Sequence, residues 1–182
     1  MDTHLPFNVR LDPFATLGLA PSFVLDVPAV ERRHRDLSRA LHPDRFVGTS
    51  SSERRAALAK AVEVNEAWRL LRDPVRRAEV LFSRVGIPID HQPATEPAFL
   101  MEILELREAL GEAQAAHDLG AITRLSTAVA ARARLLESEL AEGFESARDD
   151  RDRLEPLVGR LGQLRYLQRF LDQVRAIEDD FN

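Results

Sequence analysis

The sequence predicts an all-α protein. Apolar residues recur three and four positions apart over long segments, prolines and glycines interrupt these segments at few places, and no segment shows the apolar–polar alternation of a half-buried strand. With 182 residues and 45% hydrophobic side chains, the chain has enough apolar surface for one or two small helical domains. We therefore expect two groups of helices, divided where prolines and glycines are densest.

The first long helix is expected from Val27 to Leu41. At about 100° per residue, one side of it carries an apolar stripe that predicts a core-facing surface. This stripe comprises Val30, Leu37 and Leu41, and His34 lies beside it as a packing residue. The opposite side carries a basic ridge, which comprises Arg32, Arg35, Arg39 and His42. Such a ridge is either an ordinary solvated face or, since it leads to a bend at its end, a docking edge for an acidic partner.

The bend is the tripeptide His42-Pro43-Asp44, after which another helix begins. Pro43 has no amide hydrogen and disfavours the α conformation in His42, so the preceding helix must end here. The bend presents a titratable ring and a carboxylate with no obvious pocket around them. This suits gripping a partner protein better than processing a substrate. Taken alone, the three residues also fit an ordinary helix-ending turn.

A connector separates the two groups of helices. Asp73-Pro74 ends the helix that follows the bend, and Val75–Val85 reads as a short helix with Val75, Ala78, Leu81, Phe82 and Val85 on its apolar side. Three prolines and a glycine then break the periodicity between Gly86 and Pro97. Beyond this connector we expect helices over residues 96–117, 119–142 and 147–179. Their breaks fall at 117–120 and near Gly143, and Pro156 favours a kink or a late start in the last helix. Long helices with short connections predict an antiparallel three-helix bundle.

The helix expected over 96–117 carries two apolar stripes. The first is expected to pack in the bundle and consists of Phe99, Ile103, Leu106 and Leu110. The second consists of Leu100, Met101 and Leu104 and runs into Glu105, Glu108 and Glu112. A second stripe is usually core, because a bundle helix contacts two neighbours. Unpaired carboxylates are rarely buried, however, so the glutamates favour an exposed apolar surface with an acidic margin, suited to a basic partner.

Composition excludes several function classes. The chain has no cysteine, which excludes disulfides and thiol chemistry, and its histidines show no metal-ligand spacing, so we expect no metal and no cofactor. These histidines are His4, His34, His42, His91 and His117. Met1–Pro6 does not read as a signal peptide and no apolar run is long enough to span a bilayer, so we expect a cytoplasmic protein without a membrane partner.

The charge is unevenly divided along the chain. Residues 1–90 hold 14 basic and 12 acidic side chains, whereas residues 91–182 hold 11 and 18. Halves of opposite sign predict two separate binding functions. Neither half has a dense basic patch with interleaved aromatic residues, so we expect no nucleic-acid partner.

Residues 12–75 resemble the J-domain co-chaperones, which dock on DnaK-class chaperones and stimulate their ATPase. The resemblance rests on Pro13-Phe14-Ala15-Thr16-Leu17-Gly18-Leu19, on His42-Pro43-Asp44, on the loop Gly48-Thr49-Ser50-Ser51-Ser52, and on Ala61, Asn65, Ala67, Trp68, Leu70 and Leu71. It implies a short first helix and a helical hairpin with the tripeptide at its open end. The implied chaperone-binding residues are His42, Pro43, Asp44, Arg32, Arg35, Arg39 and Arg45.

The second half is similar to the C-terminal domain of the HscB (Jac-type) co-chaperones of iron–sulfur cluster assembly, in their bacterial form. The residues that carry this similarity are Ala98-Phe99-Leu100-Met101-Glu102, Leu104, Leu106-Arg107-Glu108, Leu110 and Leu164-Arg165-Tyr166-Leu167, with Asp73-Pro74, Arg77-Ala78 and Leu81 before them. In that family the J-domain recruits a specialised DnaK-class chaperone of the HscA type, and the C-terminal bundle holds the scaffold protein IscU.

The similarity implies a division of the chain and a second set of site residues. It implies a J-domain over residues 1–75, a connecting helix and linker over 76–94, and a scaffold-binding domain over 95–182. The implied scaffold-binding residues are Leu100, Met101, Leu104 and Tyr166, with Glu105, Glu108 and Glu112 as an acidic margin. Arg45 stands where the family usually has lysine and Tyr166 where phenylalanine is common, and neither change alters the interpretation.

Two other interpretations remain open. A J-domain adapter for a different client protein would keep the role of His42 and Asp44 but not that of Leu100, Met101 and Leu104. An enzyme with His42 and Asp44 as an acid–base pair would need a positioned substrate and a cleft, and no nucleophile or oxyanion donor accompanies them. We therefore expect a co-chaperone that is not an enzyme.

Overall fold

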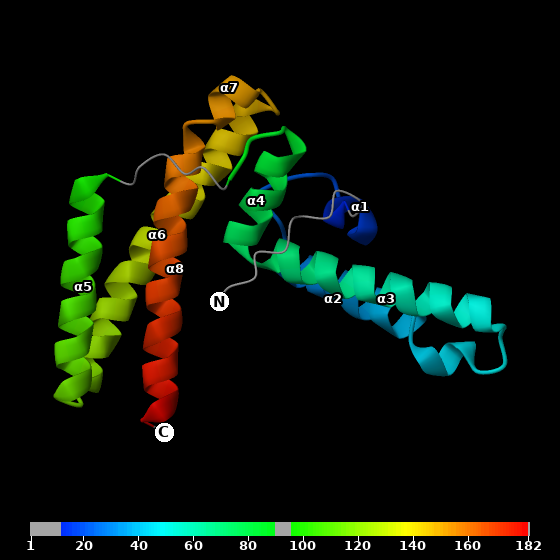
Figure 1. Ribbon diagram of the computed structural model, residues 1–182, viewed down its shortest axis with the longest axis horizontal. Helices are drawn as coiled ribbons and strands as arrows, with labels where there is room; N and C mark the ends of the chain where they lie inside the picture. The colour runs from blue at the N-terminus through cyan, green and yellow to red at the C-terminus, as the bar shows by residue number, and fades with distance from the viewer. Residues whose placement is uncertain (1–11, 90–95, 182) are drawn as a thin grey trace. The chain divides into compact units, whose positions relative to one another are not determined.

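The computed structural model describes residues 12–89 and 96–181, and the regular structure in both ranges is helical (Figure 1). This confirms the predicted all-α class. The chain divides into two compact units, Met1–Leu81 and Phe82–Asn182. The N-terminal stretch Met1–Pro6 and residues 90–95 of the expected connector, which include His91, lie outside the described residues. Within the described ranges, no helix is both long and apolar enough to cross a membrane.

The first unit begins with the short helix α1 (Pro13–Leu17). Asp12 caps its start by accepting hydrogen bonds from the amides of Phe14 and Ala15. Gly18 ends it in the left-handed conformation, with φ 63°, and the Arg33 guanidinium lies where a Cβ on Gly18 would point. Phe14 and Leu17 are fully buried, so this one-turn helix is held by its apolar side chains.

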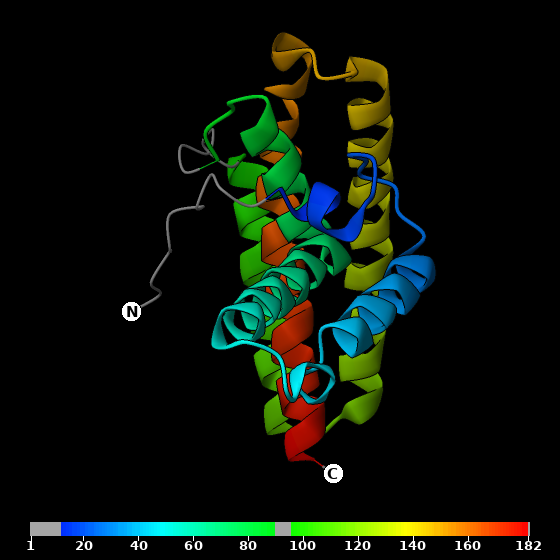
Figure 2. The same ribbon diagram turned by 90° about the vertical axis from the view of Figure 1, so that its right-hand side faces the viewer.

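A helical hairpin makes up most of the first unit. It is formed by α2 (Val27–Ala40) and α3 (Ser51–Arg72), with η1 (Pro43–Phe46), one turn of 3-10 helix, at the end that Figure 2 shows nearest the viewer. The buried side chains of the pair are Val30, Ala57, Val64, Ala67, Leu70 and Leu71. His34 is half-buried and its ring stacks on that of Trp68. Its Nε2 lies 2.9 Å from Asn65 Oδ1. These contacts confirm the predicted packing role of His34.

A capping box starts α3. The Glu53 amide donates to Ser50 Oγ, and the Ser50 amide donates to the Glu53 carboxylate. The Ser50 hydroxyl also donates to this carboxylate at 2.7 Å. The hydrogen bonds that the Glu53 carboxylate accepts hold its pKa below the usual value. The bond from the Ser50 hydroxyl has the larger effect, and the bond from the Ser50 amide the smaller.

Helix α4 (Pro74–Arg84) follows α3 at once, because Asp73 accepts from the amides of Val75 and Arg76. Its expected apolar side is buried at Val75, Ala78, Leu81 and Phe82, while Val85 lies beyond its end. The burial of Arg77 was not anticipated. Its Nη1 donates to the Leu71 carbonyl at 2.7 Å, and its guanidinium lies 5.0 Å from the centre of the Phe23 ring. Arg77 therefore ties the start of α4 to the end of α3.

The second unit is the predicted antiparallel three-helix bundle. It consists of α5 (Pro97–Ala115), α6 (Leu119–Ala147) and α8 (Leu157–Asp180), with the short α7 (Arg151–Leu154) between the last two (Figure 1). Its most deeply buried side chains are Leu110, Ile122, Leu140, Leu154, Leu161, Leu164, Leu167 and Phe170. Because these residues come from every helix of the bundle, one core holds α5, α6 and α8 together.

One expected boundary in the bundle is wrong. We expected a helix break near Gly143, but α6 continues through it to Ala147. The Leu157 side chain from α8 fills the space where a Cβ on Gly143 would stand, so glycine serves here for close packing. Such contact offsets the cost of about 1 kcal/mol that glycine adds inside a helix. The expected late start of the last helix is confirmed, since α8 begins directly after Pro156.

Candidate functional site

The first candidate surface is the bend between α2 and α3. His42 is extended, with φ −62° and ψ 135°, and forms the N-cap of η1. The Asp44 amide donates to His42 Nδ1 at 3.3 Å, and the nearer Asp44 carboxylate oxygen lies 3.3 Å from the same nitrogen. Both side chains face solvent, with 59% of His42 and 85% of Asp44 exposed. The bend is therefore exposed as predicted.

This geometry leaves the polar side chains of the tripeptide open to solvent. The Asp44 amide already donates to His42 Nδ1, so the Nε2 of the ring and the Asp44 carboxylate are the polar groups left open to a partner. Pro43 at the first position of η1 fixes the backbone between them. An acid–base catalyst would instead need an enclosed substrate position. The open position of His42 and Asp44 suits recognition of another protein surface.

The basic ridge on α2 leads to this bend. Arg32, Arg35 and Arg39 are exposed, and Arg45 in η1 is exposed as well. The ridge carries less unopposed charge than the sequence suggests, because Arg35 lies 3.4 Å from Glu31 and Arg39 is paired with Asp36. Exposed pairs of this kind contribute about 0–1 kcal/mol, so a partner's carboxylates can replace them at little cost.

The second candidate surface lies on α5. Leu100, Met101 and Leu104 are 39%, 57% and 59% exposed, whereas Phe99, Ile103 and Leu110 of the first stripe are buried. The exposed stripe is therefore not core, and Leu106 of the packing stripe is only half-buried. We refer to Leu100, Met101, Leu104, Glu105, Glu108 and Glu112 as the α5 surface.

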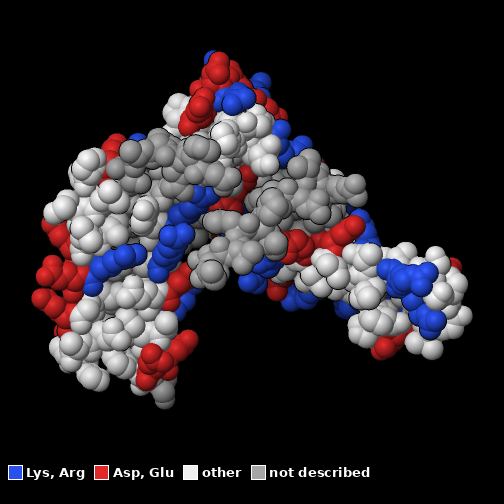
Figure 3. Space-filling model, in the orientation of Figure 1, with Lys and Arg blue, Asp and Glu red and all other residues white. Residues whose placement is uncertain are grey.

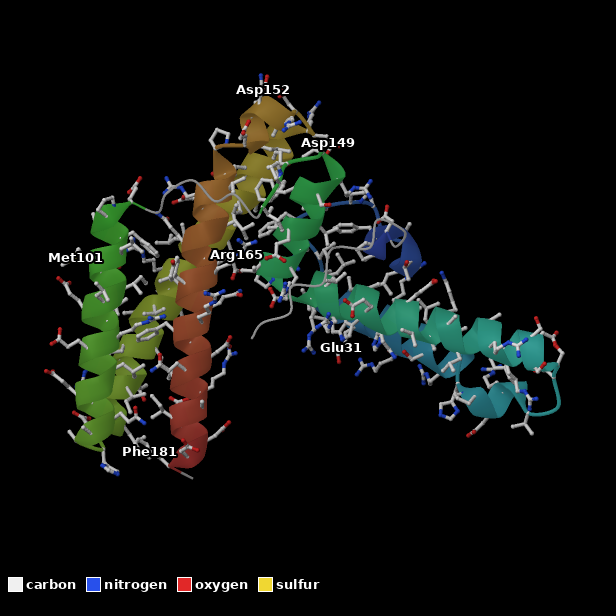
Figure 4. All side chains as sticks on the ribbon, in the orientation of Figure 1. Glu31, Met101, Asp149, Asp152, Arg165 and Phe181 are labelled. Atoms are coloured by element: carbon white, nitrogen blue, oxygen red, sulfur yellow. The ribbon has the colours of Figure 1, made fainter. Side chains whose placement is uncertain are left out.

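The acidic margin of the α5 surface is also exposed. Glu105, Glu108 and Glu112 face solvent, and Figure 3 shows acidic side chains gathered along the outer edge of α5. Met101 points away from the bundle in Figure 4. A contiguous exposed apolar strip is a feature typical of interaction surfaces. Methionine suits such a site because its side chain adapts to the shape of a partner.

Tyr166 of α8 contacts α5 through Phe99. It is half-buried, and its ring meets that of Phe99 edge-on, with 6.0 Å between the centres and 68° between the planes. Phe99 directly precedes Leu100, so the structure brings Tyr166 beside the start of the α5 surface. The two candidate surfaces lie in different units of the chain, as the division of charge suggests.

Two further residues at this place were not anticipated from the sequence. Arg132 of α6 forms an ion pair with Glu102 of α5, and its guanidinium lies 5.4 Å from the centre of the Phe99 ring. In the sequence Glu102 belongs only to the stretch that carries the family similarity, and nothing there pairs it with Arg132. The two paired residues are thirty positions apart, so no local pattern connects them.

Known proteins resemble the chain over nearly its whole length. Residues 95–175 match the family described as the HSCB C-terminal oligomerisation domain. Proteins named "Co-chaperone protein HscB homolog" from Shewanella oneidensis and Bordetella avium are 32% and 37% identical to it. These alignments cover 91% and 76% of this chain, and 96% and 82% of the relatives. The relative from Paraburkholderia phymatum is 40% identical over 63% of this chain and 66% of its own length.

Two solved structures share the fold. "Chaperone HscB from Vibrio cholerae" superposes with a TM-score of 0.80 and 29% identity, over 94% of this chain and all of that one. The human co-chaperone protein HscB gives a TM-score of 0.79 with 26% identity, over 94% of this chain and 83% of that one. Both units are covered by these similarities.

Proposed function

Since the chain belongs to the HscB family of co-chaperones, we propose that it stimulates the ATPase of a DnaK-class chaperone of the HscA type and delivers the iron–sulfur scaffold protein IscU to it. The observation that carries this proposal is that one chain exposes two unlike surfaces in two units. One is basic and ends at His42-Pro43-Asp44, and the other is apolar with an acidic margin on α5. The proposal places the protein in the cytoplasm, with no nucleic-acid or membrane partner.

In the first unit, the basic ridge acts first and the bend acts second as the chaperone docks. Arg32, Arg35 and Arg39 attract and orient an acidic face of the chaperone, which raises the rate of productive encounter. His42 and Asp44 then make the specific contact, since both side chains are mostly exposed and adjacent at the open end of the hairpin. ATP hydrolysis takes place in the chaperone, and this chain catalyses no step itself.

In the second unit, the α5 surface holds the scaffold. Leu100, Met101 and Leu104 supply the apolar anchors that carry most of the binding energy in a protein interface. The three glutamates at the margin select a basic partner and discourage others. We assign Tyr166 to the same contact because its ring packs against Phe99 at the start of this surface.

A turnover assay of the chaperone ATPase tests both halves together. We expect this protein alone to stimulate hydrolysis, and we expect protein and IscU together to stimulate it further. Absence of any stimulation would remove the J-domain mechanism. Stimulation that IscU does not increase would favour an adapter for a different client, and isothermal titration with IscU would then show no binding.

Reversal of the basic ridge should weaken chaperone docking. Changing Arg32, Arg35 and Arg39 to glutamate opposes the electrostatic attraction, so we expect a several-fold higher protein concentration for half-maximal stimulation. Added salt should weaken the wild-type interaction, since exposed charges are screened within about 8 Å at physiological ionic strength and about 3 Å at 1 M. The measurement is chaperone turnover without scaffold against protein concentration.

A matched control is available for this experiment. Arg124, Arg134 and Arg175 in the second unit are also exposed, and changing them to glutamate alters the net charge equally. Arg124 and Arg175 also have acidic neighbours, Asp118 and Asp172. If both triple variants behave alike, or if stimulation is insensitive to salt, the ridge is only a solvated face.

A further inference from the structure

We propose that Glu102 and Arg132 are positioning residues, which hold the first turns of α5 so that Leu100, Met101 and Leu104 present one preformed surface to the scaffold. This inference rests on the proposed function, because it concerns how the scaffold-binding surface is kept in shape. The residues involved are Phe99, Glu102, Arg132 and Tyr166, which we call the Phe99 junction. Neither Glu102 nor Arg132 belongs to the α5 surface itself.

Three helices meet at the Phe99 junction. The Phe99 side chain comes from α5 and is only 3% exposed. The Arg132 guanidinium from α6 lies 5.4 Å from its ring centre, and the Tyr166 ring from α8 meets it edge-on at 6.0 Å. Both are favourable geometries for an aromatic ring. The ring is thus contacted from both neighbouring helices.

The Arg132–Glu102 pair adds a second link between α6 and the same part of α5. A planar guanidinium can lie over a ring and donate to a carboxylate at once, which a lysine ammonium does less well. Arg132 therefore fixes two points on α5, one at Phe99 and one three residues later at Glu102. Two points on adjacent turns define both the rotation of the helix about its axis and its shift along it.

Phe99 and Glu102 lie next to the exposed residues that are proposed to bind the scaffold. Phe99 directly precedes Leu100, and Glu102 lies between Met101 and Leu104 in the chain. Any rotation of the first turns of α5 would move the contacts of the junction and the three exposed anchors together. Interface affinity depends on such preorganisation, because a surface that must be ordered on binding loses free energy to do so.

The beginning of α5 has no side-chain cap, although Pro97 at its first position favours the helical backbone. Glu96 is its N-cap and makes no side-chain capping hydrogen bond, in contrast to the caps of α1, α2, α3 and α6. The first amides of a helix have no partner within the helix, so an uncapped first turn frays readily. Tertiary contacts such as those of the Phe99 junction then decide whether this turn stays ordered.

The pair itself is suited to local positioning more than to global stability. The Glu102 and Arg132 side chains are 34% and 43% exposed, and ion pairs this open contribute little to the free energy of folding. The bundle core behind them is made by other residues. Variants at these two positions should therefore fold, which makes the proposal testable.

The test compares Arg132→Met and Glu102→Gln with the wild type. Three quantities are measured: amide hydrogen exchange of residues 98–104 in the free protein, affinity for IscU by isothermal titration, and the midpoint of thermal unfolding. We expect faster exchange in this segment, about 5–10-fold weaker binding, which corresponds to about 1.0–1.4 kcal/mol, and an unfolding midpoint within a few degrees of the wild type.

Arg160→Met is the matched control. Arg160 forms an ion pair of 2.9 Å with Glu139 between α8 and α6, and both side chains are about half exposed, but the pair does not involve α5. We expect this variant to leave both the amide exchange of residues 98–104 and IscU affinity unchanged. An equal effect from Arg160→Met would mean that any loss of an interhelical pair disturbs the bundle, and would overturn the proposal.

The outcomes separate this inference from the proposed function. Weaker binding with unchanged exchange would mean that Arg132 touches the scaffold directly, and faster exchange with normal binding would mean that the order of α5 does not matter. Either result overturns the positioning role. A parallel Leu104→Ala variant that binds IscU normally would instead remove the α5 surface as the scaffold site, whatever the exchange data show.

Discussion

His42→Gln or Asp44→Asn will abolish stimulation of the chaperone ATPase while leaving the helical circular dichroism nearly unchanged. Both side chains are mostly exposed, and their contacts within η1 are local, so their loss should change the free energy of unfolding by no more than about 0.5 kcal/mol. Glutamine replaces the imidazole ring by an amide, and asparagine removes the carboxylate charge, so each variant loses one polar group of the bend at similar volume. Stimulation is measured as chaperone turnover at saturating co-chaperone.

Val47→Ala is a suitable control for these two variants. Val47 is the residue directly after η1 and is highly exposed, so its replacement alters the same stretch of surface without touching the His42–Asp44 pair. We expect this variant to stimulate normally. Full stimulation by His42→Gln or by Asp44→Asn would show that the bend is only a helix-ending turn.

Replacing Leu100, Met101 and Leu104 together by alanine will greatly weaken binding of the scaffold protein. Apolar anchors at the centre of an interface cost about 2 kcal/mol or more each when truncated, and 1.4 kcal/mol is a factor of ten. We therefore expect IscU binding to fall by at least about a hundredfold in isothermal titration. The unfolding temperature should change little, because all three side chains are exposed in the free protein.

The opposite pattern would contradict this assignment. Buried leucine or methionine changed to alanine costs about 2–5 kcal/mol each, so a core stripe would give a steep fall in unfolding temperature with normal binding where the protein is folded. Leu119→Ala with Leu135→Ala is the control, since both are exposed leucines on α6 in the same unit. This variant should retain full affinity.

Local patterns in the sequence predicted most of the fold. Helical periodicity located the long helices, and the Asp73-Pro74 step correctly marked the end of α3, because both signals depend on neighbouring residues. The break expected near Gly143 was wrong because Leu157, which justifies glycine there, comes from another helix. The burial of Arg77 was also missed because it depends on a residue far away in the chain: its guanidinium lies over the ring of Phe23, which precedes α2.

The candidate site shows the same division between local and distant information. The exposure of Leu100, Met101 and Leu104 followed from the glutamates that continue their stripe, because carboxylates indicate solvent on that side of the helix. The Phe99 junction could not be predicted, since its members come from three helices. The positions of the arginines in the sequence were enough to locate the basic ridge. That Glu31 and Asp36 partly neutralise it could be seen only from the ion pairs in the structure.

The acidic margin of the α5 surface also bears on what happens when no partner is bound. An exposed apolar strip tends to meet its own copy, and a two-fold dimer would bring identical patches together. In such a pair Glu105, Glu108 and Glu112 of both copies would face one another, and like charges in contact oppose association. Under the proposed function, the same three carboxylates would therefore have two effects: they would favour a basic scaffold and oppose pairing of this face with its own copy.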